Sequence, residues 1–206
     1  MSEVNPRVAD YPIDRQFLER WSPRAFTGEP VPENELRTMF EAARWAPSSS
    51  NLQPWRFLYA RQGTPHFEKF LALLVDGNKV WAKNAGALVV LISKTTQPVS
   101  GTDKVAPSRT HSFDTGTAWG YLALEAMRLG WAAHAMAGFH VERTIVDLGI
   151  PEDYRPEAAI AIGRRDDKSI LPEYLQAREE PNSRRPQRDF VSEGGFPPPD
   201  RRPEQF

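Results

Sequence analysis

The sequence predicts an α+β fold, with a few buried strands, several helices and a long C-terminal extension. The strongest strand signal is the unbroken apolar run at residues 85–93, which is typical of a strand buried on both faces. The strongest helix signal lies at residues 114–129, where a wide apolar stripe predicts a central, largely buried helix. From residue 166 the chain is rich in Pro, Arg and Glu and poor in apolar residues, so this part cannot form a core of its own.

A chain of 206 residues suits one domain that buries a single core. We expect residues 1–206 to form that domain, with residues 1–12 as a flexible lead-in. Residues 166–206 are expected to form an extended tail that lies along the body or along a partner.

Charge and cysteine content exclude several classes of function. The net charge is −1, so no overall basic field would recruit nucleic acid. Cysteine is absent, which excludes disulfides, thiolate nucleophiles, iron–sulfur clusters and cysteine zinc sites. The longest apolar run is far shorter than the roughly 20 residues that span a bilayer, and the first residues lack the apolar core of a signal peptide. We expect a soluble, cytoplasmic protein with no membrane partner.

The other elements follow from periodicity and from capping residues. Helices are expected where apolar residues recur at three- and four-residue steps, at residues 14–20, 32–46, 67–75 and 141–148. Strands are expected in the short apolar runs 55–61, 131–136 and 158–163. Residues 76–78 should end the helix at 67–75, and Asp114 should cap the long helix. The polar stretch 95–111 is long for a loop, and it either orders over a ligand as a lid or frays.

Residues 47–55 form a polar turn, Pro-Ser-Ser-Ser-Asn-Leu-Gln-Pro-Trp, between a helix and a strand. Pro47 ends the helix because the residue before a proline is disfavoured in the α region. The turn is crowded with short hydroxyl and carboxamide side chains, namely Ser48, Ser49, Ser50, Asn51 and Gln53. Ordinary turn chemistry explains them, and so does a polar rim around a planar ligand rich in nitrogen and oxygen. The turn alone leaves both interpretations open.

A second polar segment is Arg20-Trp21-Ser22-Pro23-Arg24. In an extended chain Arg20, Ser22 and Arg24 alternate, and so they point toward the same side. Two guanidinium groups and a hydroxyl can bind an anion, because Arg matches phosphate oxygens with two parallel hydrogen bonds. A solvated basic turn is the other interpretation of this segment taken alone.

Together, the two segments resemble the FMN-dependent nitroreductase family, and the resemblance runs from Arg20 nearly to the C-terminus. Further matches follow in order: Asn78, Asp114-Thr115-Gly116-Thr117-Ala118, Leu129-Gly130-Trp131, Ala135-Met136-Ala137-Gly138-Phe139, Ala159-Ile160-Ala161-Ile162-Gly163 and Ser183-Arg184-Arg185-Pro186. The resemblance implies a nitroreductase-like fold, with a central, mostly antiparallel sheet flanked by helices. It also implies an intertwined homodimer with shared FMN sites.

The resemblance assigns the arginine segment to the FMN phosphate. Arg20, Ser22 and Arg184 match positions that hold the phosphate, with Trp21 inside the same motif. Arg24 matches a basic position near N1 and O2 of the flavin, where a fixed cation stabilises the reduced ring and raises its reduction potential. Two positions depart from the family: Trp21 and Asn182 stand where a further cation is common, so the phosphate would receive less charge.

The remaining cofactor contacts are also implied by the resemblance. The polar turn would reach the FMN of the partner chain through Pro47, Ser48, Ser49, Ser50, Asn51 and Gln53. Asn78 matches a contact to the pyrimidine edge of the flavin. Met136, Ala137 and Gly138 would offer main-chain N–H groups to flavin N5, where glycine allows a close approach.

The implied activity is hydride transfer from NADPH or NADH to FMN and onward to a nitroaromatic, a quinone or an activated alkene. The two half-reactions would use one pocket in turn (ping-pong). One alternative is an FMN-dependent oxidase or dehalogenase of the same fold, since fold does not fix function. Another is a flavin-binding or protein-interaction module without turnover.

No catalytic side chain and no metal site are expected, because the flavin itself carries the hydride. The four histidines lack metal-ligand spacing. His66, His134 and His140 are expected to be structural, whereas His111 is the one candidate for a substrate contact. No Ser-His-acid arrangement is evident in the sequence.

Overall fold

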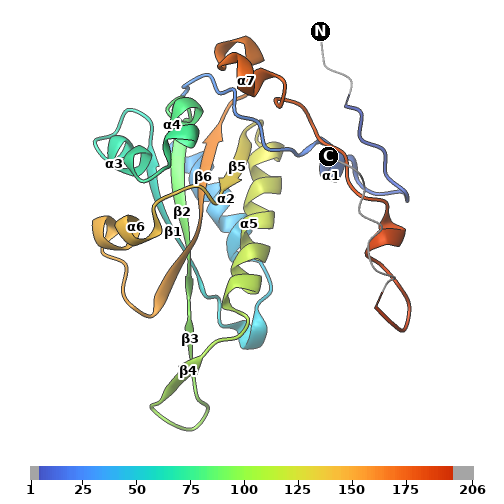
Figure 1. Ribbon diagram of the computed structural model, residues 1–206. Coiled ribbons are helices and arrows are strands. Elements are labelled where there is room, and N and C mark those ends of the chain that lie inside the picture. Colours follow the sequence, from blue (N-terminus) through green and yellow to red (C-terminus); the bar gives the residue numbers. More distant parts are fainter. Residues whose placement is uncertain (1–4, 197–206) are drawn as a thin grey trace.

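The computed structural model describes residues 5–196, and its centre is a four-stranded sheet in the order β1-β2-β6-β5 (Figure 1). The strands are β1 (Trp55–Arg61), β2 (Ala87–Lys94), β5 (Ala132–Met136) and β6 (Tyr154–Gly163). Every neighbouring pair is antiparallel, as predicted. Residues 1–4 of the predicted lead-in and residues 197–206 of the predicted tail lie outside the described residues.

Strand β2 is buried on both faces, which explains its unbroken apolar sequence. Leu88 and Val90 join the core on one face of the sheet, and Val89 and Leu91 join the core on the other. None of the four is more than 3% exposed. A strand with no solvent face favours apolar side chains at successive positions, so the usual alternation is missing over residues 87–92.

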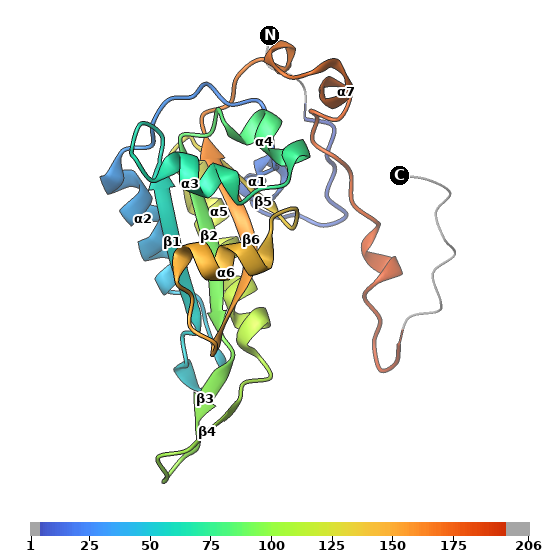
Figure 2. The same cartoon turned by 60° about the vertical axis from the view of Figure 1, so that its left-hand side comes forward.

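Helices cover both faces of the sheet (Figures 1 and 2). On one face lie α2 (Glu33–Arg44) and α5 (His111–Arg128), and on the other lie α3 (Phe67–Ala72), α4 (Asp76–Ala82) and α6 (Val141–Leu148). In α2 the buried stripe includes Leu36, Met39 and Ala43. Phe40 is partly buried and packs against Phe57 of the edge strand, with 5.2 Å between ring centroids.

The prediction that residues 76–78 end a helix is wrong, because these residues begin α4. The chain bends between α3 and α4, where Leu74 forms a β-bridge with Phe139 and the Val75 N–H donates to the Gly138 carbonyl. Pairing with a distant segment therefore interrupts the helical pattern. The bend places Asn78 beside Gly138.

The polar stretch 95–111 is an ordered β-hairpin. Strands β3 (Thr96–Pro98) and β4 (Val105–Pro107) pair antiparallel and project from one end of the body (Figure 1). Helix α5 begins at His111, and Asp114 lies inside its first turn instead of preceding it. There the Asp114 carboxylate accepts a hydrogen bond from the Thr110 hydroxyl at 3.0 Å.

Helix α5 is buried along one side only, which differs from the expected largely buried helix. Leu122 is fully buried, but Phe113 is 78% and Tyr121 42% exposed. Gly116 and Gly120 share the outer side with these aromatic residues, and no atom lies within 4 Å of a Cβ built at either glycine. The single chain therefore leaves an aromatic and glycine surface of α5 open.

Residues 5–20 and 166–196 together form an arm beside the body (Figures 1 and 2). The arm contains α1 (Arg15–Glu19), η2 (Lys168–Ile170), α7 (Glu173–Gln176) and η3 (Gln187–Asp189). Leu171 and Leu175 anchor its base in the core at 4% and 6% exposure, whereas Phe190 further along is 60% exposed. The lead-in runs along the tail, where the Gln187 N–H donates to the Asp10 carboxylate at 2.7 Å.

Candidate functional site

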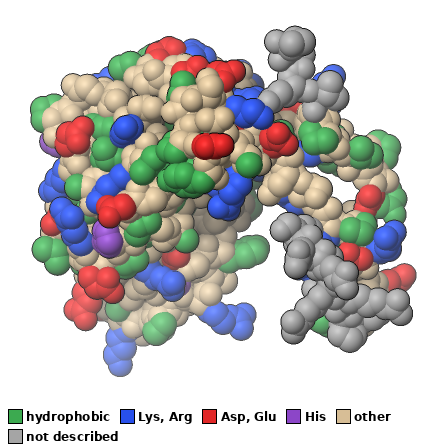
Figure 3. Space-filling view, turned by 45° about the horizontal axis from the view of Figure 1, so that its top comes forward, with side chains coloured by type: hydrophobic (Ala, Val, Ile, Leu, Met, Phe, Trp, Pro, Cys, Tyr) green, Lys and Arg blue, Asp and Glu red, His purple; other side chains and the backbone are tan. Residues whose placement is uncertain are grey.

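An arginine-rich cavity of about 620 Å³ lies between the body and the arm. Figure 3 looks down on the end of the molecule from which the arm extends. The lining comes from segments far apart in sequence: residues 20–24, strand β5 and the tail near residue 180. It includes five of the predicted cofactor residues, Arg20, Trp21, Ser22, Arg24 and Arg184.

Positive charge dominates this cavity. Among residues 5–196, five arginines line it, but the only carboxylate in the lining is that of Glu180. Burial lowers the pKa of Arg20, and repulsion from Arg184 lowers it further. Burial likewise lowers the pKa of Arg7, and Arg184 and Arg20 add to the effect. Because these cations repel one another, an anion among them would be stabilised, and phosphate matches their geometry.

Arg24 is held in place by a buried carboxylate of the tail. Glu179 Oε1 accepts the main-chain N–H groups of Arg24 and Ala25 at 2.6 and 2.8 Å. Its Oε2 lies 3.8 Å from the Arg24 guanidinium. Burial lowers the pKa of Arg24, and Glu179 partly offsets this. Glu179 is 4% exposed, so it locks the segment 20–24 to the tail, a contact across 155 residues that no local pattern reveals.

His134 also lines the cavity, although it was expected to be only structural. Its Nδ1–H donates to the Pro23 carbonyl at 2.9 Å, and its ring packs against Trp81 with 4.7 Å between centroids. Burial is the main cause that lowers the pKa of His134 to about 4, and repulsion from Arg24 acts in the same direction. His134 is therefore neutral at pH 7, so its Nε2 is a hydrogen-bond acceptor.

Mild acid should destabilise the fold through His134. The pKa is about 4 in the folded chain and near 6.5 when unfolded, so the unfolded chain binds more protons between these values. Stability is full above pH 6.5 and falls as the pH drops toward 4, by about 2 kcal/mol between pH 7 and pH 5. Urea unfolding at both pH values should show this loss in the wild type and less of it in His134→Gln. Equal losses of stability in the wild type and in His134→Gln would contradict this role of His134. His66→Gln, at an exposed position, is the control.

Asn78 and Gly138, two predicted cofactor residues, are in direct contact. The Asn78 Nδ2 donates to the Gly138 carbonyl at 2.9 Å. A Cβ at position 138 would lie 2.7 Å from that nitrogen, so only glycine allows this approach. Within residues 5–196, the main-chain N–H groups of Ala137 and Gly138 have no hydrogen-bond acceptor. Met136 is 4% exposed and packs in the core.

The polar turn at residues 47–53 has an unusual backbone. It contains the short helix η1 (Ser49–Asn51). Three non-glycine residues have positive φ angles, Ser50 at 50°, Asn51 at 54° and Gln53 at 48°. Such residues cost roughly 1 kcal/mol or more each and tend to occur at ligand sites. Within the turn, Ser48 Oγ accepts a hydrogen bond from the Gln53 N–H at 3.0 Å. From α5, the Asp114 carboxylate accepts one from the Ser49 N–H at 3.2 Å.

The turn and the arginine cavity lie at opposite ends of α5. The turn contacts the first turn of the helix through Asp114. Arg20 and Trp21 line a smaller cavity together with Met127 and Gly130, at the other end of the helix. Helix α5 has 18 residues and is therefore roughly 27 Å long. In one chain, the two predicted parts of the cofactor site do not meet.

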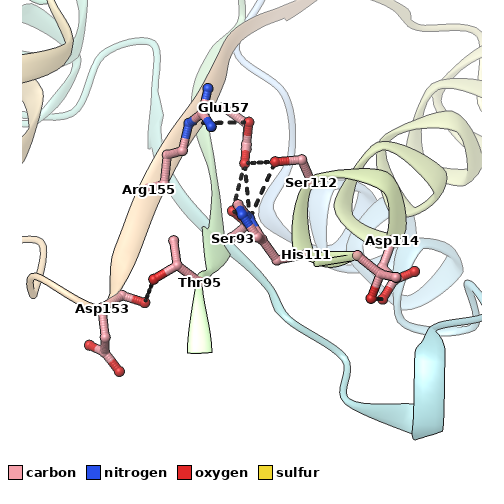
Figure 4. Close-up of polar contacts among 9 residues, drawn as sticks. Ser93, Thr95, His111, Ser112, Asp114, Asp153, Arg155 and Glu157 are labelled. Atoms are coloured by element: carbon pink, nitrogen blue, oxygen red, sulfur yellow. Dashed lines mark hydrogen bonds and ion pairs between the residues drawn. The ribbon is translucent and has the colours of Figure 1, made fainter. Parts of the chain in front are cut away.

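The fold also assembles a Ser-His-Glu cluster that was not evident in the sequence (Figure 4). The Ser93 hydroxyl donates to Glu157 Oε1 at 2.6 Å and lies 2.7 Å from His111 Nδ1. The Ser112 hydroxyl donates to the same Glu157 oxygen at 2.6 Å. Both Ser93 and Glu157 face one ring nitrogen, whereas a hydrolase triad uses both nitrogens of the histidine. The cluster instead joins β2 and β6 to the first turn of α5, from which Asp114 holds the polar turn.

Comparison with known proteins shows the family. The model of the nitroreductase family matches residues 18–69 and 59–164. The chain belongs to the nitroreductase family. A crystal structure described as an oxidoreductase containing FMN is 47% identical, with a TM-score of 0.91 over 95% of this chain and 98% of its own. A nitroreductase family protein of Clostridium difficile 630 shares the fold at 18% identity, with a TM-score of 0.68 over 90% of this chain and all of its own.

Two further relatives are similar over most of their own length. A Streptococcus pyogenes protein provisionally named an NAD(P)H nitroreductase is 28% identical over 187 residues, which cover 74% of this chain and 92% of that protein. An NADH dehydrogenase of Thermus thermophilus is 31% identical over 174 residues, which cover 71% of this chain and 83% of that protein.

Within residues 5–196, no group of three or more His, Cys, Asp or Glu side chains is placed to bind a metal ion. None of the helices described here combines the length and the apolar character needed to cross a membrane.

Proposed function

We propose that this protein takes hydride from NADPH or NADH and passes the electrons to a nitroaromatic, a quinone or an activated alkene in a ping-pong reaction. The chain is an FMN-dependent oxidoreductase of the nitroreductase family. Bound FMN supplies the hydride chemistry, and the protein binds and orients the reactants. The observation that carries this proposal is the cavity in which mutually repelling arginines meet. We further propose that the protein works in the cytoplasm, where reduced nicotinamides are supplied.

The residues of this chain fit the two ends of FMN. Arg20, Ser22 and Arg184 line the cavity and suit a dianionic phosphate. Asn78 donates through Nδ2 to Gly138, which leaves its Oδ1 to accept from an N–H of the pyrimidine edge. The main-chain N–H groups of Ala137 and Gly138, which have no acceptor among residues 5–196, suit flavin N5. His134, neutral in the cavity, can accept a hydrogen bond from a cofactor hydroxyl without adding charge.

We also propose a homodimer in which each FMN contacts both chains. The exposed side of α5, with Phe113 and Tyr121 beside two open glycines, suits close packing against a second copy. The polar turn adjoins this helix but lies roughly a helix length from the arginine cavity of its own chain. A two-fold arrangement would bring the turn of one chain to the cavity of the other.

Anaerobic mixing of the FMN-loaded protein with NADPH or NADH tests the reaction. The proposal expects loss of the visible flavin absorbance, followed by its recovery when a model quinone is added. If neither nicotinamide reduced the flavin, an oxidase or dehalogenase activity would be favoured instead. If another reductant bleached the flavin but no acceptor restored its absorbance, the protein would be a module without turnover.

Arg24→Ala should weaken FMN binding and lower the reduction potential of the bound flavin. A cation close to the reduced ring stabilises its negative charge. If the substitution removes about 1.4 kcal/mol of this stabilisation, the two-electron reduction potential of the flavin falls by about 30 mV. Redox titration of the bound flavin measures this shift. Arg44→Ala on the exposed side of α2, where Arg44 pairs with Glu41, is the matched control and should change neither property. If Arg24→Ala and Arg44→Ala had equal effects on the bound flavin, Arg24 would not have the proposed role beside the ring.

A further inference from the structure

Arg7, in the N-terminal lead-in, ties together the two parts of the chain that form the arginine cavity. Its Nη1 donates to the carbonyls of Leu18 and Arg20 at 3.1 and 2.7 Å. Its Nε donates to the Asn182 carbonyl at 2.8 Å, and its Nη2 to Asn182 Oδ1 at 3.0 Å. One guanidinium group therefore joins the end of α1 to the tail, a contact between residues 175 positions apart.

Asn182 also links Arg7 to Arg184, which is a predicted phosphate contact. Its Oδ1 also accepts a hydrogen bond from Arg184 Nη1 at 2.9 Å. Asn182 is thus an acceptor that bridges Arg7 and Arg184. Arg7 adds positive charge to the cavity from the lead-in, a different segment of the chain from Arg20 and Arg184.

The contacts of Arg7 hold its guanidinium group close to those of Arg20 and Arg184. Repulsion from Arg184 and Arg20 and burial all disfavour the charged form of Arg7. The four hydrogen bonds to neutral oxygens oppose this repulsion but do not neutralise it. An anion bound among the three guanidinium groups would remove the repulsion and so stabilise the contacts of Arg7.

We propose that Arg7 is a clasp that closes the arginine cavity around the phosphate of FMN, and that bound FMN in turn locks the N-terminal segment onto the tail. This inference rests on the proposed function, which supplies FMN as the anion. Because four N–H donations of Arg7 go to protein oxygens, its role is to position Arg20 and Arg184. Coupling of this kind is reciprocal: the clasp strengthens FMN binding by the same factor by which FMN strengthens the clasp.

Arg7 variants test whether the clasp strengthens FMN binding. Arg7→Ala should weaken FMN binding about 10-fold, within the usual range for coupled sites. Arg7→Lys keeps the charge but lacks the planar fork, so it should bind FMN several-fold more weakly than the wild type. Riboflavin, which lacks the phosphate, should bind all three proteins equally. Arg15→Ala, which removes an exposed guanidinium paired with Glu19, should behave as the wild type.

Trypsin cleavage after Arg7 tests whether bound FMN strengthens the clasp. The protease must bind the Arg7 side chain in its own specificity pocket, so it can cut only when Arg7 has left its contacts with the protein. Mass spectrometry should show cleavage of the Arg7–Val8 bond about 10-fold more slowly with saturating FMN than without it. The same rate with and without FMN, or wild-type FMN affinity in Arg7→Ala or Arg7→Lys, would overturn the clasp. A wild-type chain that bound no FMN would instead overturn the proposed function.

Discussion

Arg20→Glu should reduce the affinity for FMN by at least about 100-fold. A hydrogen bond between charged groups contributes about 1.5–3 kcal/mol, and the substitution also places a negative charge beside the phosphate. A loss of about 2.7 kcal/mol corresponds to 100-fold in the dissociation constant. The effect should be this large because Arg20 is partly buried and, within residues 5–196, no carboxylate pairs with it. Quenching of flavin fluorescence measures the dissociation constant.

The matched control for this prediction is Arg37→Glu on α2. Arg37 is 65% exposed and pairs with Glu33, away from the cavity, so this charge reversal should leave the FMN affinity unchanged. Circular dichroism of both variants checks that the fold is intact. An affinity of folded Arg20→Glu within about threefold of the wild type would show that the cavity does not hold the phosphate.

Mixed dimers should regain cofactor binding that each parent has lost. One parent carries Arg20→Glu in the cavity, and the other carries Ser49→Trp in the polar turn, where Ser49 is exposed in the single chain. If each site combines the cavity of one chain with the turn of the other, a heterodimer has one intact site and one doubly altered site. Random mixing makes half of the dimers heterodimers, so about a quarter of all sites should bind FMN.

The control is the double variant with both substitutions in one chain, refolded together with the wild type. That heterodimer has two sites with one defect each, so only the wild-type homodimers should bind FMN. Size-exclusion chromatography confirms that all mixtures are dimeric. If the mixture of single-variant chains bound no more FMN than its parents, the site would lie within one chain.

The fold was largely predictable because its central signals are local. Residues 87–92 of β2 are all apolar since both faces of that strand are covered, and this can be seen in the sequence without knowing its neighbours. The range of β1 at residues 55–61 was also predicted correctly, as was that of α6 at residues 141–148. Helix α6 ends at Gly149, which has a left-handed conformation. Proline, glycine and the hydrophobic pattern act on the residues beside them, so these boundaries could be inferred.

The contacts that complete the site could not be inferred, because they join distant segments. Arg7 lies in a stretch without helical or strand periodicity, and only the fold brings it to Asn182. Glu179 reaches Arg24 in the same way. His134 offered one weak signal, a polar residue on the same face of β5 as Met136, whose side chain is buried. The open side of α5 has a different cause: a wide apolar stripe does not say which part of it faces the protein's own core.

Titration of the purified apoprotein with FMN, combined with the mass of the complex in solution, tests the central claim most directly. The account predicts a yellow complex that binds one FMN per chain and has the mass of two chains. A colourless protein that takes up no FMN, or a single chain that binds FMN as tightly as the dimer, would contradict it.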